Sequence, residues 1–202
     1  METMSALPLR LASLDLIEDF LLDPPGAAED VRRKPPLARG LAAYLLGGLS
    51  VALVSTLFSS ARGFAWVWPS IALACLWHVF AGAVMTAIFH LIAEAVGGEG
   101  RASSLFVLLG FSDLGWALVL PGALLANALR PDSYWPLPLL LLIGGLLTFW
   151  FRVRSVGHNY GLSMARATMV VVLPYGAAAV LSVVVLLLAA WSMVAQAIKL
   201  FS

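Results

Sequence analysis

The stretch HLIAEAVGGEGR, residues 90–101, ends a long apolar run with two glutamates, three glycines and an arginine. From Gly40 onward the chain repeats this pattern, with charge-free runs separated by short polar or glycine-rich breaks. A helix needs about 20 mostly apolar residues to cross the roughly 30 Å hydrocarbon core of a bilayer. The pattern therefore predicts an all-α fold, a polytopic integral membrane helix bundle.

The composition supports this class. Of the 202 residues, 61% are hydrophobic and only 11% are charged, whereas soluble domains usually contain about 25% charged residues. Membrane spans would use most of the chain and leave no sizeable soluble domain. A net charge of +1 gives no support for nucleic-acid binding.

The charge-free intervals predict five spans in a membrane domain of residues 40–202, preceded by a cytoplasmic tail of residues 1–39. Their approximate limits are residues 40–61, 69–93, 105–129, 135–151 and 167–191. Glycines 97, 98 and 100 are expected to stop the second helix and form a turn. Pro174-Tyr175-Gly176 is a candidate hinge within the fifth span.

The sequence pattern of the tail predicts an amphipathic helix from Leu9 to Leu22, with acidic side chains opposite an apolar face. The helix should end before Pro24-Pro25. The acidic residues Asp15, Glu18 and Asp19 within it argue against a signal peptide. An acidic polar face does not suit an anionic lipid surface. We therefore expect this helix to dock on protein, with a disordered tail as the alternative.

The distribution of Lys and Arg predicts the orientation. With a cytoplasmic N-terminus, nine of these residues lie on the cytoplasmic side and three on the other. We therefore expect the N-terminus inside and the C-terminus outside. The excess of Arg over Lys, with abundant Ala, Leu and Gly, is typical of a GC-rich bacterial genome and indicates a bacterial inner membrane.

Polar and small side chains of the second span recur every four residues, at His78, Gly82, Thr86, His90 and Glu94. In lipid such a ridge is expected to form a packed helix seam, and Ser112 and Asp113 of the third span complete the candidate intramembrane polar seam. A proton or ion path is the second interpretation, and a metal or catalytic site is the third. No HExxH motif or cysteine cluster supports a metal site, so we expect no metal, no cofactor and no catalytic residue.

Asp113 is the only acidic residue well inside a predicted span. A carboxylate there should face the bundle interior and find a partner or take up a proton. Counting depths on antiparallel spans predicts that Asp113 lies within reach of Thr86 or His90, while Ser112 points elsewhere. A neutral aspartate that serves only helix packing is the alternative.

Basic residues near the predicted cytoplasmic ends form a candidate lipid or partner face, which comprises Arg101, Arg152, Arg154, His158 and Arg166. They could bind lipid head groups or an acidic partner. Alternatively, the arginines only set the orientation of the spans, because cytoplasmic loops carry an excess of Lys and Arg.

Two segments resemble a known family. HLIAEAVGGEGRASSLFVLLGFSDL is similar to the junction of the second and third spans in the Ypt-interacting-protein (Yip) family, with Gly110-Phe111-Ser112 in place of a Gly-Tyr-Ser element. FWFRVRSVGHNYGLSMARA resembles its junction of the fourth and fifth spans, at His158, Gly161, Leu162, Ser163 and Ala165. No Asp-Leu-Tyr-Gly-Pro element precedes the first span. The resemblance therefore implies a bacterial-type Yip-domain protein with five spans and a cytoplasmic N-terminus.

These observations lead to two hypotheses of function. The first is a non-enzymatic membrane protein that organises membrane or binds a protein partner at its cytoplasmic face. Its expected partners are the lipid bilayer and a protein of unknown identity or another copy of the chain, with no nucleic acid. The alternative is a small transporter or a protein that conducts ions or protons through Asp113 and His90.

Overall fold

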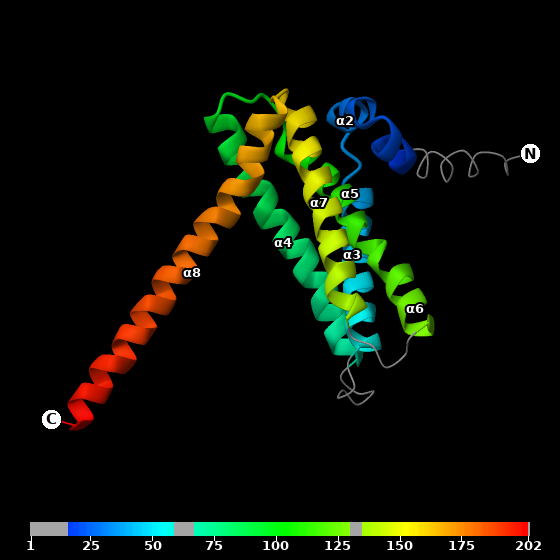
Figure 1. Ribbon diagram of the computed structural model, residues 1–202. Coiled ribbons are helices and arrows are strands. Elements are labelled where there is room, and N and C mark those ends of the chain that lie inside the picture. Colours follow the sequence, from blue (N-terminus) through cyan, green and yellow to red (C-terminus); the bar gives the residue numbers. More distant parts are fainter. Residues whose placement is uncertain (1–15, 59–66, 130–134, 202) are drawn as a thin grey trace, which may run out of the picture.

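The computed structural model describes residues 16–58, 67–129 and 135–201, and these ranges contain helices and connections but no strand. After a helical stretch at residues 16–22, the helices are α2 (Pro24–Arg33), α3 (Leu37–Leu57), α4 (Val67–Ala95), α5 (Ala102–Ala117), α6 (Val119–Leu129), α7 (Pro136–Tyr160) and α8 (Met164–Phe201) (Figure 1). The all-helical class is confirmed for the described residues.

Five segments are long and apolar enough to cross a membrane. They are Leu37–Leu57, Val67–Ala95, Ala102–Leu129, Pro136–Tyr160 and Met164–Val194. The third is divided at Leu118 into α5 and α6, and α8 continues as a helix through Pro174. The five predicted apolar segments are thus present, with different limits.

The fourth segment differs most from its prediction. It was expected to end at Phe151, but α7 continues to Tyr160 and then stops at Gly161, whose φ of 64° is left-handed. Arg152 was taken as the polar end of the span, whereas its charge is paired with Asp113 inside the bundle. Arg154, Ser155 and His158 consequently lie in a helix.

The opening stretch forms the expected helix stop. α4 ends at Ala95, Gly97 has a left-handed φ of 85°, and the Gly98 N–H donates to the Ala93 carbonyl at 2.8 Å. This bond satisfies a carbonyl that the end of the helix would otherwise leave unpaired.

The central helix of the bundle is α5, which packs against α3 and α7. The backbones of α3 and α5 lie very close together at Gly40 and Gly110. A Cβ added to Gly110 would lie 2.5 Å from the Gly40 carbonyl oxygen. Only the first part of α8 packs against the bundle, at Ala167, Val170 and Val171. From Leu173 to Val194 nearly all of its side chains are exposed, and Figure 1 shows α8 diverging from α4 and α7.

The helix α2 was not predicted. Asp23 caps it by accepting a hydrogen bond from the Gly26 N–H at 3.4 Å, and Pro24 occupies a first-turn position that suits proline. The predicted break before Pro24-Pro25 is present, but a second helix follows it. Residues 9–15 of the predicted amphipathic helix lie outside the described residues.

The segment 16–33 packs on the bundle rather than extending away from it. Phe20 contacts the rings of Phe111 and Phe151, each with a centroid separation of 5.6 Å. Val31 and Phe20 join one buried cluster with Val107 and Leu108 of α5. We call the face formed by α2, the α4–α5 connection and the α7–α8 connection the α2 end of the bundle.

Candidate functional site

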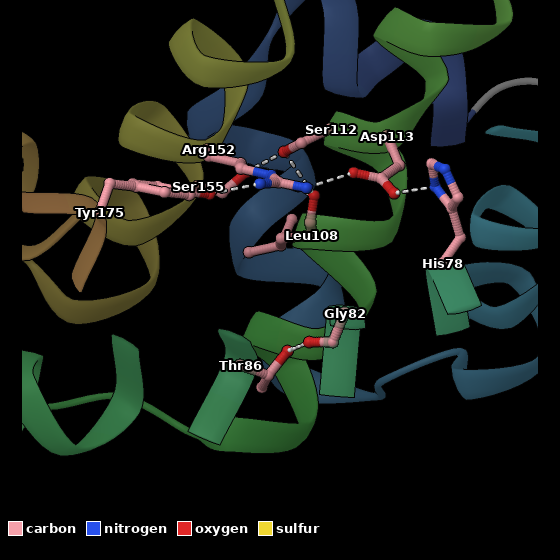
Figure 2. Close-up of polar contacts among 9 residues, drawn as sticks. All are labelled: His78, Gly82, Thr86, Leu108, Ser112, Asp113, Arg152, Ser155 and Tyr175. Atoms are coloured by element: carbon pink, nitrogen blue, oxygen red, sulfur yellow. Dashed lines mark hydrogen bonds and ion pairs between the residues drawn. The ribbon is translucent and has the colours of Figure 1, made fainter. Parts of the chain in front are cut away.

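A buried charge pair links α5 to α7. Asp113 lies about 17 Å along α5 from its start, at 1.5 Å per residue, and its side chain is 3% exposed. Its Oδ1 accepts a hydrogen bond from Arg152 Nη2 at 2.7 Å, and its Oδ2 lies 3.2 Å from His78 Nδ1. Figure 2 shows the carboxylate between these two partners.

The predicted partners of Asp113 were wrong. Thr86 donates to the Gly82 carbonyl of its own helix at 2.7 Å, and His90 Nδ1 lies 2.7 Å from the Tyr160 hydroxyl. The depth count assumed that the axes of the two antiparallel spans are aligned. Figure 1 shows instead that α4 crosses the bundle obliquely. The ridge residue that meets Asp113 is therefore His78.

The other members of the candidate seam have separate partners. Ser112 points toward α7, since its Oγ donates to the Leu108 carbonyl at 2.9 Å and lies 3.1 Å from Ser155 Oγ. Glu94 lies 3.5 Å from His90 Nε2, near the α2 end. The polar residues of the candidate seam thus form several separate contacts along the bundle instead of one continuous seam.

Arg152 extends the network to a fourth helix. Its Nη1 donates to the Tyr175 hydroxyl of α8 at 2.7 Å, so α4, α5, α7 and α8 meet through four polar side chains. We call His78, Asp113, Arg152 and Tyr175 the polar cluster. Arg152 was a candidate for the cytoplasmic lipid or partner face, but its side chain is only 19% exposed and is held by Asp113.

The remaining basic residues lie at or near the α2 end. Arg101 is exposed, and its guanidinium donates to the Arg32 carbonyl at 3.4 Å. Arg154 and His158 are half-buried along the last turns of α7, and Arg166 is exposed at the start of α8.

Two cavities adjoin the polar cluster, and both are lined by Arg152 and Tyr175. The smaller, about 260 Å³, also has His78, Asp113 and the Trp77–Met85 stretch of α4 in its wall. The larger, about 450 Å³, is lined by α5, α7 and α8. We call the larger one the α7–α8 cavity, and its other lining residues are Trp116, Gly145, Thr148, Phe149 and Val172.

The chemistry of the cluster is that of a charge-neutral ion pair with two polar neighbours. Burying both charges costs desolvation free energy, which is offset only when the two groups are well oriented and hydrogen-bonded. Both carboxylate oxygens of Asp113 have a protein partner. Among the described residues, no group of three or more His, Cys, Asp and Glu side chains could hold a metal ion.

Sequence reasoning missed Tyr175. It belongs to Pro174-Tyr175-Gly176, which was interpreted only as a hinge, although its hydroxyl is a polar group in an otherwise apolar span. The presence of this hydroxyl in an apolar segment could have indicated that Tyr175 has a polar partner. Its pairing with Arg152 depends on how α7 and α8 pack.

A scan against protein-family models, a search of curated proteins and a search of solved structures each give no match to this chain.

Proposed function

We propose that this chain is a non-enzymatic integral membrane protein of the bacterial Yip type that binds a protein partner through its α2 end, facing the cytoplasm. The observation that carries the proposal is the docking of segment 16–33 on the bundle. A docked segment presents a defined surface, which a loose tail does not.

The docking of this segment changes which residues are available to a partner. Phe20, Ala27, Ala28 and Val31 are buried against the protein's own helices, so they cannot also form a partner contact. The exposed surface of α2 is polar, and it includes the Glu29–Arg33 pair, whose atoms lie 3.3 Å apart. A shallow pocket there is lined by Glu29, Arg32, Arg33 and Arg101.

This surface favours a partner with acidic side chains. Three of the four pocket residues are arginines, and guanidinium groups bind carboxylates in bidentate geometry. Hydrogen bonds fix the surface to the bundle, from Arg101 to the Arg32 carbonyl and from Ser104 Oγ to the Val31 carbonyl at 3.4 Å.

Site-specific photo-crosslinking in intact cells tests the proposal. A photoreactive phenylalanine analogue at Arg33 should give a discrete protein adduct, which Arg101→Glu should weaken because it reverses a charge in the pocket. The matched control is the same analogue at Leu186, an exposed apolar position of α8, which should give lipid adducts. Adducts at Leu186 and none at Arg33 would contradict a partner site at the α2 end.

Proton or ion conduction is the second candidate, and the position of the His78–Asp113 contact favours it. Intramembrane ionisable residues often mark proton relays. Against this function, Asp113 is also bonded to Arg152, and buried apolar side chains such as Phe89, Leu105 and Leu109 pack between the helices toward the α2 end. Flux measurements on Asp113→Asn distinguish the two functions.

A further inference from the structure

We propose that the α7–α8 cavity binds a single-chain amphiphile with an anionic head, such as a long-chain carboxylic acid, with its carboxylate at Arg152 and Tyr175. This proposal is independent of partner binding at the α2 end. It rests on the donors that line the cavity, on its apolar walls and on its position in the fold.

The polar groups of this cavity are donors. Arg152 uses two of its N–H groups for Asp113 and Tyr175, and a guanidinium carries further N–H donors. The Tyr175 hydroxyl accepts from Arg152 and keeps its own O–H to donate. Thr148 also lines the cavity, but its Oγ1 is buried against Gly115 of α5 and is no donor to a ligand there.

The carboxylate of Asp113 distinguishes the two cavities. It lines the smaller cavity together with His78, but it does not line the α7–α8 cavity. A ligand in the α7–α8 cavity therefore meets the Arg152 N–H groups that Asp113 and Tyr175 do not use and the Tyr175 hydroxyl, with no carboxylate in the cavity wall. Such a set of groups selects an anionic acceptor.

The rest of the wall suits an acyl chain. Trp116, Phe149 and Val172 give it an apolar surface, and Gly145 leaves space, since a Cβ there would meet only the Trp116 ring at 3.6 Å. The volume of about 450 Å³ is within the range of small-ligand sites. Apolar walls with a few convergent polar groups are the usual composition of such sites.

The position of the cavity gives access from the side. It lies where the packing of α8 against α7 ends, since Val171 is buried while Val172 and Tyr175 are 45% and 43% exposed. Arg152 lies about 12 Å along α7 from its end at Tyr160. This depth suits a single-chain acid that enters between helices better than a phospholipid, whose two chains hang from a surface head group.

Equilibrium binding of radiolabelled palmitate to the full chain in phosphatidylcholine nanodiscs tests the proposal. The wild type should bind palmitate saturably, above empty nanodiscs, and methyl palmitate should not compete because it lacks the anionic head. Gly145→Leu fills the cavity and should weaken binding at least tenfold. Gly176→Leu, at a position where an added Cβ meets nothing within 4 Å, should bind as the wild type does.

Tyr175→Phe keeps the ring and removes the hydroxyl, so it should weaken palmitate binding without filling the cavity. If Gly145→Leu does not give folded protein, Val172→Phe fills the same cavity from α8. The proposal is overturned by wild-type binding no greater than that of empty nanodiscs, by unweakened binding in a folded cavity-filling variant, or by equal competition from methyl palmitate. Equal competition from phosphatidylglycerol would overturn the assignment to a single-chain acid.

Discussion

Asp113 Oδ1 and Arg152 Nη2 lie 2.7 Å apart and join the central helix α5 to α7 deep within the bundle. Each residue was interpreted separately from the sequence, Asp113 as a lone intramembrane acid and Arg152 as the polar end of a span. Their contact changes what a substitution at either position should do.

Single and double substitutions should behave differently at this pair. Asp113→Asn leaves the Arg152 charge buried without its counter-ion, so we expect a loss of about 3–5 kcal/mol in the free energy of unfolding. Arg152→Gln should have a similar effect. The double variant removes both charges and should recover most of the stability, as measured by reversible unfolding in mixed detergent micelles. Additive losses in the double variant would show that the two side chains do not interact.

The docking of segment 16–33 should depend on Phe20. Phe20→Ser removes a buried aromatic side chain that contacts Phe111 and Phe151, and such burial contributes roughly 1.5–3 kcal/mol. A cysteine at the buried position Ala28 should then react much faster with a soluble thiol reagent, in a Cys75→Ser background. Leu22→Ser is the matched control, because Leu22 is 77% exposed. Equal labelling rates in both variants would argue against the docked arrangement.

The α3–α5 crossing should not tolerate a larger residue at Gly110. A Cβ there would meet the Gly40 backbone, whose carbonyl oxygen would lie 2.5 Å away, so Gly110→Ala should separate the two helices and lower the thermal unfolding midpoint by several degrees. Gly176→Ala, which adds the same methyl group where no atom lies within 4 Å, should leave it unchanged. Similar midpoints for the two variants would mean that α3 and α5 do not approach this closely.

Cysteine labelling tests the orientation derived from the charge bias. Glu99 in the α4–α5 connection and Ser163 in the α7–α8 connection are exposed and serve as labelling sites. In a Cys75→Ser background, cysteines at these positions should resist an impermeant reagent in intact cells, and one at Ser202 should react. Labelling from outside at Glu99 or Ser163 would reverse the orientation.

The number of apolar segments could be predicted because span length is fixed by bilayer thickness and charges are excluded from the spans. The end of the fourth segment could not, because a charge such as Arg152 can lie inside a bundle when Asp113 pairs with it. The helix α2 could have been predicted from Asp23-Pro24, because an N-cap aspartate followed by a first-turn proline is typical of a helix start. The partners of Asp113 and Phe20 depend on helix crossing angles, which one sequence does not specify.

Proton flux through reconstituted liposomes tests most directly the central claim of the proposal, namely that this chain is a partner-binding membrane protein and does not transport protons. Liposomes containing the full chain, a pH-sensitive dye and a valinomycin-driven potassium gradient should show the same flux as empty liposomes, and His78→Gln should make no difference. Flux above that of empty liposomes that is lost in a folded His78→Gln or Asp113→Asn variant would contradict the account.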